Sequence, residues 1–118
     1  MSIDPLPEAS PSRTAHPVMA RPIMALLDLV SRRWALRILW ELRDGPLTSR
    51  ALRSRCDDVS PTVLQTRVTE LRQAGLVDLA PRSGYRLSTL GMELGAVLLR
   101  LSQFADIWSQ RSAPPSSP

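Results

Sequence analysis

Arginine is the residue type of this chain with the clearest capacity for binding chemistry. All 15 basic residues among the 118 are Arg, and the net charge is +4. Seven of them lie in residues 32–55, where only Glu41 and Asp44 oppose them, so this stretch alone carries +5. Because a guanidinium group binds phosphate in a bidentate manner, such a cluster suits a polyanion. A solvated helix face explains the same charge pattern, so the charge alone leaves both interpretations open.

Residue types that serve catalysis or metal binding are sparse. One Cys, Cys56, excludes an internal disulfide. With one His, His16, the chain cannot build a structural zinc site from Cys and His, because such a site takes four ligands. No Cys/His pair and no pair of carboxylates stands at a useful spacing. We therefore expect no enzyme activity, no metal and no cofactor.

Composition also predicts the domain organisation. Residues 1–21 and 112–118 are rich in Pro and Ser, and such segments bury too little apolar surface to offset the entropy of ordering. We predict disordered tails there and one folded domain over 22–111. The longest apolar run, residues 23–27, is too short for a membrane span, and the N-terminus lacks the pattern of a secretory signal. These features predict a cytoplasmic protein, which would be nucleoid-associated if its arginine cluster binds DNA.

The folded part shows mainly helical periodicity. Pro22 suits the first turn of a helix over 22–30. Trp34, Ile38 and Leu42 follow at i, i+4 and i+8, which predicts a second helix that ends at Asp44-Gly45-Pro46. A short third helix is capped by Thr48 or Ser49 and ends near Cys56-Asp57-Asp58.

The fourth helix has the clearest start and end signals. Ser60 is a good N-cap and Pro61 a good first helical residue. Leu64, Val68 and Leu71 form its inner stripe, and Gly75 caps its end.

A change of period follows, which indicates strands. Residues 76–79 and 85–88 read as two short strands, and 80–84 carries the turn residues of a hairpin. Thr89 then caps a last helix over about 89–111.

The last helix is more apolar than a single buried face requires. Other helices could cover it, but a large apolar patch rarely stays exposed, which favours a homodimer. Gly91 and Gly95 would permit close helix approach across such a seam. The predicted dimer interface consists of Leu94, Val97, Leu98, Leu101, Phe104 and Trp108.

The last three of the four helices before the hairpin, followed by the hairpin, have the order of a winged helix-turn-helix. We therefore predict a mainly α fold with a small β-hairpin wing, a winged helix-turn-helix with an added C-terminal dimerisation helix. The turn Asp57-Asp58-Val59 fits the helix-turn-helix connection.

Four motifs in order then point to a family. Ser31-Arg32-Arg33-Trp34 opens the second helix, and Leu42-Arg43-Asp44-Gly45-Pro46 ends it. The fourth helix begins Val59-Ser60-Pro61-Thr62-Val63-Leu64, and Tyr85-Arg86-Leu87-Ser88-Thr89-Leu90-Gly91 follows the hairpin. The stretch from Met24 to Trp108 thereby resembles the HxlR family of bacterial transcriptional regulators, whose motifs are Gly-Gly-Lys-Trp, Leu-x-x-Gly-Pro, Ile-Ser-Pro-x-Val-Leu and Tyr-x-Leu-Thr-x-x-Gly.

The chain departs from the family at three places. The third helix reads Thr48-Ser49-Arg50-Ala51-Leu52 where the family often has Arg-Phe-x-Glu-Leu, and the wing is shorter. Some family members sense oxidants through a Cys near the N-terminus, and this chain has none there. Cys56 stands beside two carboxylates, which disfavour its thiolate form, while Arg53 and Arg55 favour it. Cys56 could therefore be a redox sensor or a plain buried thiol.

Helix geometry predicts how such a domain would read DNA. With about 100° per residue and Leu64 inward, the outward face of helix 60–74 is polar and nearly uncharged, which suits the major groove. Arg67 fits a phosphate contact or an ion pair with Glu70 or Asp78. The wing, 79–86, is expected on the backbone or minor groove. The residues expected at the DNA are Ser60, Thr62, Gln65, Thr66, Arg67 and Thr69, with Arg50, Arg53 and Arg82.

The resulting functional hypothesis is a sequence-specific, double-stranded DNA-binding transcriptional regulator. The expected partners are a palindromic promoter site and a second copy of the chain, with no membrane. A winged helix that binds protein instead is the alternative. A small-molecule effector could occupy a cleft lined by Trp34, Trp40, Phe104 and Trp108, although aromatic residues at helical spacing more often form core.

Overall fold

The computed structural model describes residues 21–112. The predicted tails lie outside this range apart from Arg21 and Ser112, and so does His16. The chain forms two compact units, residues 1–36 and 37–118. In the first unit, α2 (Pro22–Val30) begins with Pro in its first turn, as predicted, and none of its residues is buried. Its large side chains Ile23, Met24 and Leu27 are about half exposed.

Two short helices begin the second unit's architecture. The α3 helix (Ala35–Glu41) continues into a 3-10 turn, η1 (Leu42–Asp44), and the predicted stop lies where Gly45 takes φ +145°. Thr48 caps α4 (Ser49–Arg55) by accepting a hydrogen bond from the Ala51 amide at 3.1 Å. This settles the choice between Thr48 and Ser49 as the cap.

The α5 helix (Pro61–Gln73) has the start and end that its sequence predicts. The Ser60 hydroxyl accepts the Val63 amide at 3.2 Å, and Pro61 occupies the first turn. At the C-terminus Gly75 takes φ +80°, and the Gly75 and Leu76 amides donate to the carbonyls of Arg72 and Leu71. This paired arrangement is a Schellman motif, which needs a residue that tolerates positive φ.

Each strand of the hairpin lies one residue closer to the turn than predicted. The strands are β1 (Val77–Ala80) and β2 (Gly84–Leu87), antiparallel, with Val77 opposite Leu87. The predicted ranges 76–79 and 85–88 were wrong at their outer ends because Leu76 completes the end of α5 and Ser88 caps the next helix.

A third short strand position joins the hairpin and was not predicted. The Leu47 amide donates to the Tyr85 carbonyl at 2.9 Å, and the Tyr85 amide donates to the Leu47 carbonyl at 2.8 Å. A single paired residue has no periodicity, so the sequence pattern offers no signal for it.

The last helix, α6 (Thr89–Ser112), has Thr89 as its first helical residue, and Ser88 precedes it as the cap. The prediction of Thr89 as the cap was wrong. Ser88 fills that role: its Oγ accepts the Gly91 amide at 2.9 Å and donates to the Gly75 carbonyl at 2.6 Å. One side chain therefore caps α6 and ties it to the end of α5.

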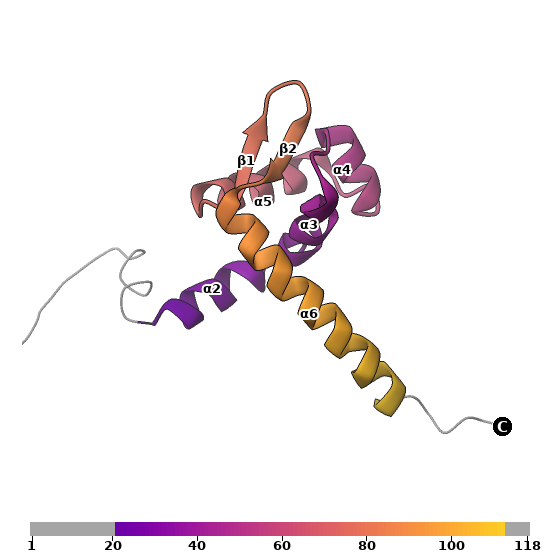
Figure 1. The fold of residues 1–118 in the computed structure, drawn as a ribbon. Helices are drawn as coiled ribbons and strands as arrows, with labels where there is room; N and C mark the ends of the chain where they lie inside the picture. Colours follow the sequence, from indigo (N-terminus) through magenta and orange to yellow (C-terminus); the bar gives the residue numbers. More distant parts are fainter. Residues whose placement is uncertain (1–20, 113–118) are drawn as a thin grey trace, which may run out of the picture. The chain divides into compact units, whose positions relative to one another are not determined.

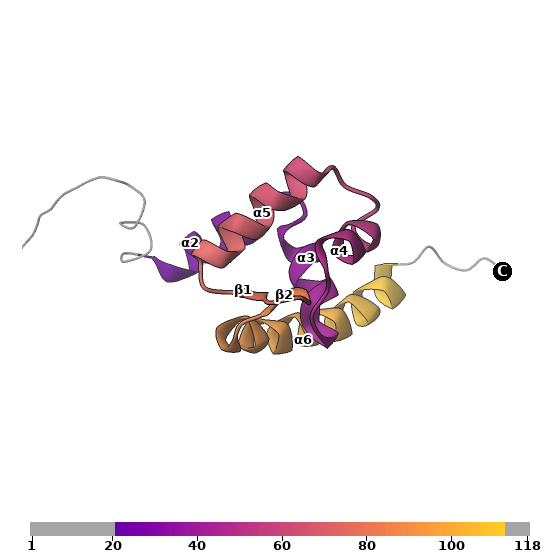
Figure 2. The same ribbon diagram turned by 90° about the horizontal axis from the view of Figure 1, so that it is seen from above.

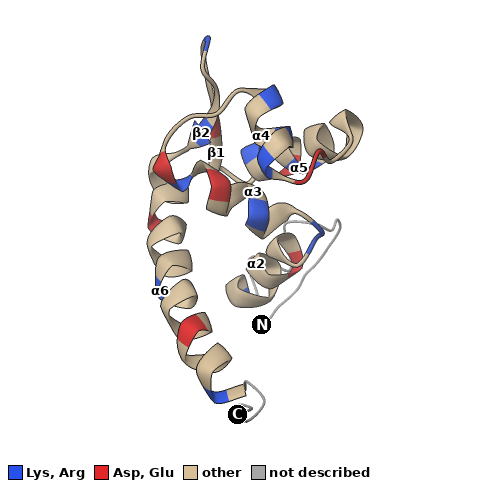
Figure 3. Cartoon of the chain, turned by 90° about the vertical axis from the view of Figure 1, so that its right-hand side faces the viewer, with Lys and Arg blue, Asp and Glu red and all other residues tan. Residues whose placement is uncertain are grey.

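Within the second unit the hairpin lies between two helices. Figure 2 shows β1 and β2 with α5 on one side and α6 on the other, and β2 also contacts η1. Large side chains of α3, η1, α4, α5 and the strands are buried, and they form the apolar core. Figures 1 and 3 show that the C-terminal half of α6 extends beyond the hairpin, where its side chains are exposed.

The two glycines of α6 serve contacts inside the chain. Gly91 is buried, and a Cβ added there would overlap the Leu76 carbonyl oxygen. A Cβ at Gly95 would contact the Leu87 side chain at 3.4 Å. The expectation of close approach by a second copy is therefore wrong for Gly91, whose open side is filled by the Leu76 carbonyl; for half-buried Gly95 it stays a prediction.

We predict that Gly84→Ala destabilises the fold much more than Gly75→Ala. Both glycines have positive φ, which costs a residue with Cβ about 1–3 kcal/mol. The added Cβ at Gly84 also overlaps the Leu47 carbonyl and the Thr48 Cα, whereas at Gly75 the space is open. Urea unfolding of both variants measures the difference. Equal losses would show that the Leu47–Tyr85 pairing leaves room for a methyl group.

Candidate nucleic-acid interface

The α5 helix separates a buried face from a polar face. Leu64, Val68 and Leu71 are buried, as the sequence predicts. Thr62, Gln65 and Thr66 are exposed on the other side. Because the core holds the inner stripe, the polar face has a defined direction and few charges that would compete for base edges.

Hydrogen bonds orient the central residue of this face. Gln65 Nε2 donates to Thr69 Oγ1 at 3.2 Å, and the Tyr85 hydroxyl donates to Gln65 Oε1 at 3.4 Å. The Gln65 amide is thus aligned by its own helix and by β2, with one N–H and one acceptor position remaining. Tyr85, in β2, is not among the residues that the sequence predicts at the DNA, although it begins the last of the family motifs.

Two hydroxyl groups of the predicted site also have local partners. Thr66 Oγ1 donates to the Thr62 carbonyl at 2.9 Å, which leaves its oxygen and methyl group accessible. Ser60 Oγ accepts from Val63 and keeps its own proton as a donor at the positive end of α5.

Arg50 and Arg82 are the predicted arginines that remain available for a ligand. Both are exposed, and neither forms a hydrogen bond or ion pair with the residues that the structure describes. Arg82 lies in the turn after Pro81 with φ +67°, an uncommon value for a residue with Cβ, and the Ser83 amide closes the turn on Ala80 at 2.9 Å. Figure 3 shows basic positions on α4 and at the hairpin tip.

Arg53 and Arg67 are anchored in the fold. Arg53 Nε donates to the Val59 carbonyl at 2.9 Å and so supports the turn before α5. Arg67 forms an ion pair with Glu70 at 3.2 Å, which is one of the two ion pairs that its sequence position allowed. Both side chains are partly buried. The Arg53 contact supports the turn before α5, whereas the Arg67–Glu70 pair lies within α5 itself.

Arg37 shows that part of the basic cluster has a structural role. Its guanidinium binds Glu41 at 2.8 Å, donates to the Arg55 carbonyl at 2.6 Å and lies 3.8 Å from Asp57. It thereby joins α3 to the C-terminal end of α4. Charge density alone therefore overstates the number of arginines that are available for phosphate.

Cys56 is a fully buried thiol. Its exposed fraction is 0%, and it forms the C-cap of α4. Burial is the main cause that raises the pKa of Cys56; Arg37 opposes this effect, and Glu41 and Asp57 add to it. A raised pKa and no exposure favour a structural thiol over a reactive one.

Among residues 21–112, none of the helices is both long enough and apolar enough to span a membrane. In the same range, no cluster of His, Cys, Asp and Glu could hold a metal ion.

Comparison with known proteins places this fold in a family. The HxlR-like helix-turn-helix family matches residues 29–113. The HTH-type transcriptional regulator YvaP of Bacillus subtilis strain 168 is 30% identical over 88 residues, which are 70% of this chain and 82% of YvaP. The chain therefore belongs to the HxlR-like helix-turn-helix family, and it is a DNA-binding transcriptional regulator, as its motifs predict.

Solved structures agree with this assignment. Quinone-bound YodB from B. subtilis is 27% identical, with a TM-score of 0.66 over 72% of this chain and 96% of that chain. A candidate HxlR family transcriptional factor from Thermoplasma volcanium GSS1 is 25% identical, with a TM-score of 0.65 over 75% of this chain and 85% of that chain. The predicted winged helix-turn-helix fold is confirmed.

We predict that Cys56 reacts with a thiol reagent only after unfolding. Native protein at pH 8 should react far more slowly than protein in urea, because the folded state buries the sulfur and raises its pKa. The same shift stabilises the fold fully below the unfolded pKa of about 8.5, and this contribution is lost as pH rises through the folded pKa. Equal native and unfolded rates would contradict the structural role.

Proposed function

We propose that α5 reads base edges in the major groove of a specific DNA site. The observation that carries this proposal is the polar face of α5, with Gln65 aligned by Thr69 and Tyr85. A Gln amide can bond adenine through its N–H and its oxygen together, and a Thr hydroxyl or methyl can contact other bases. The residues proposed to face the groove are Ser60, Thr62, Gln65, Thr66 and Thr69.

The wing and α4 are proposed to contact the DNA backbone. Arg82 at the hairpin tip and Arg50 at the start of α4 carry charges without a partner among the residues described. Such charges position a protein on phosphates without reading sequence. Arg53 already donates to the Val59 carbonyl, so its proposed role is to hold the turn before α5 in place. Arg67 already pairs with Glu70 of the same helix, so it is proposed as a weaker phosphate contact than Arg50 or Arg82.

Dimerisation through α6 is the second part of the proposal. Val97, Leu101, Phe104 and Trp108 recur at helical spacing and are each more than half exposed, up to 60% for Trp108. Leu98, at 7%, is buried in the single chain, on a different side of the helix. Of the predicted interface, Leu98 therefore supports the monomer fold, while the exposed stripe, with half-buried Leu94 beside it, is proposed to pair with a second copy.

A symmetric dimer would present two α5 helices to one face of DNA. Two-fold symmetry in the protein corresponds to a palindromic site whose halves lie about 34–36 Å apart, one helical turn. A small-molecule effector stays a prediction of the sequence; the quinone in the comparison belongs to YodB.

We predict that variants of the base-reading residues and of the phosphate-contacting residues change DNA binding in different ways. Gln65→Ala and Thr66→Ala should each cost about 1–3 kcal/mol of binding free energy at the cognate site and little on random DNA. Arg82→Ala should weaken binding to both and lower the slope of log affinity against log salt by about one. Fluorescence anisotropy on cognate and random duplexes over a salt series measures both quantities.

The outcomes separate the parts of the proposal. An unchanged ratio of cognate to random affinity in Gln65→Ala and Thr66→Ala would show that α5 is not the reader. An unchanged salt slope in Arg82→Ala would show that the wing does not reach phosphate.

We predict that Phe104→Glu and Trp108→Glu convert the protein to a monomer while it stays folded. Each change places a charge in the exposed stripe without touching the core. Gln103→Glu, on the same helix but outside the stripe, is the matched control and should remain dimeric. Sedimentation at micromolar concentration gives the mass. Wild-type protein that sediments only as a monomer would refute dimerisation.

A further inference from the structure

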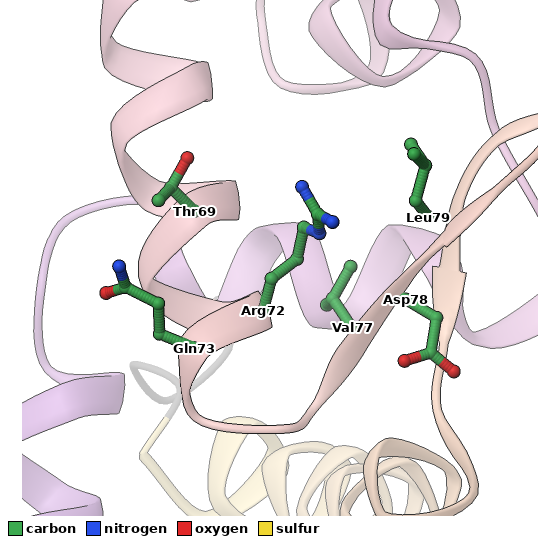
Figure 4. A pocket seen from close by; sticks show the side chains of 6 residues that line it. All are labelled: Thr69, Arg72, Gln73, Val77, Asp78 and Leu79. Atoms are coloured by element: carbon green, nitrogen blue, oxygen red, sulfur yellow. The ribbon is translucent and has the colours of Figure 1, made fainter.

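A hollow lies between the second half of α5 and the first strand of the wing. Its volume is about 400 Å³. Figure 4 shows its lining from both elements: the side chains are Thr69, Arg72 and Gln73 of α5 and Val77, Asp78 and Leu79 of β1. Of these residues the sequence predicts only Thr69 at the DNA, and Arg72 is not part of the predicted site.

Arg72 provides an unsatisfied positive charge at this hollow. It is exposed and forms no ion pair or hydrogen bond with residues 21–112. In Figure 4 its guanidinium group extends into the space between the helix and the strand, on the same side as Leu79, while the Asp78 carboxylate points the other way. The nearest carboxylate of the lining is thus turned away from the guanidinium.

Thr69 adds a second donor. Its Oγ1 accepts the Gln65 side-chain N–H at 3.2 Å, so the hydroxyl proton of Thr69 remains to be donated. Gln73 contributes an exposed amide. The polar side of the hollow therefore offers donors to an anion, and Leu79, which is half exposed, offers an apolar surface beside them.

The position of the hollow indicates which anion would enter. One phosphate strand separates the major groove from the adjacent minor groove. If α5 lies in the major groove and the wing lies on the neighbouring backbone or minor groove, that strand must cross the space between α5 and β1. This step rests on the proposed function.

We propose that the hollow between α5 and β1 receives a backbone phosphate of the bound DNA. Arg72 binds the phosphate oxygens through its guanidinium fork, and the Thr69 hydroxyl donates to the same group. Because Thr69 also accepts from Gln65, the phosphate contact and the base-reading side chain share one hydrogen-bonded chain: phosphate, Thr69, Gln65 and Tyr85. Leu79 packs beside the sugar.

The test compares Arg72 with a matched arginine outside the interface. Arg72→Ala should weaken binding to cognate and random DNA alike, by roughly tenfold at low salt, and lower the salt slope by about one. Arg100, on α6, is also exposed and also has no partner among the residues described. Arg100→Ala should change neither the affinity nor the salt slope. Arg72→Gln keeps most of the side-chain stem and should match Arg72→Ala.

A second variant changes a residue of β1 that lines the hollow. Asp78→Asn removes the negative charge at the lining and should raise affinity for both DNAs, with the ratio of cognate to random affinity unchanged. Thermal unfolding of each variant checks that the fold is intact.

The outcomes distinguish this inference from the proposed function. Wild-type protein whose DNA affinity does not fall steeply with salt would overturn the proposed function itself. Wild-type binding with a steep slope, but equal behaviour of Arg72→Ala and Arg100→Ala, would overturn only the phosphate site. An Arg72→Ala loss confined to the cognate duplex would also overturn it, since it would make Arg72 a base reader.

Discussion

The pairing of Leu47 with Tyr85 is the contact on which the arrangement of α4, α5 and the hairpin depends. Two backbone hydrogen bonds of 2.9 and 2.8 Å hold the residue before the α4 cap against β2. Thr48, its neighbour, starts α4, and Tyr85 reaches Gln65 on α5 through its hydroxyl. The wing is therefore coupled to both helices of the helix-turn-helix. Gly84 is required beside this pair because a side chain would collide with the Leu47 carbonyl.

The arginines form two groups, those that stabilise the fold and those that are proposed to contact a polyanion. Arg37 and Arg53 donate to the backbone carbonyls of Arg55 and Val59, at the end of α4 and at the start of α5. Carbonyls near a helix C-terminus lack partners within the helix, so a guanidinium group satisfies them and also complements the negative end of the helix. Arg50, Arg72 and Arg82 are exposed and have no such partner among the residues described, and they are the arginines proposed to contact phosphate. Net charge in the sequence does not separate these two groups.

The α6 helix uses different sides for different contacts. Gly91 and Leu98 lie against the chain's own fold, where Gly91 permits the close approach of the Leu76 carbonyl. The stripe through Phe104 and Trp108 stays exposed. A helix that is apolar on more than one side needs more than one partner surface. The monomer supplies one, and the proposed second copy supplies the other, which would also set the spacing of the two reading helices.

The helices, their inner stripes and the family could be predicted from the sequence alone. Ser60-Pro61, Gly75 and the stripe of Leu64, Val68 and Leu71 depend on local chemistry, since caps and helical periodicity act over a few residues. Only the tertiary structure decided the contacts between distant segments. Arg37 and the Arg55 carbonyl are 18 residues apart, and Gln65 and Tyr85 are 20 apart. No local rule selects such partners, because hydrogen bonds over that separation form only after the core has placed both elements.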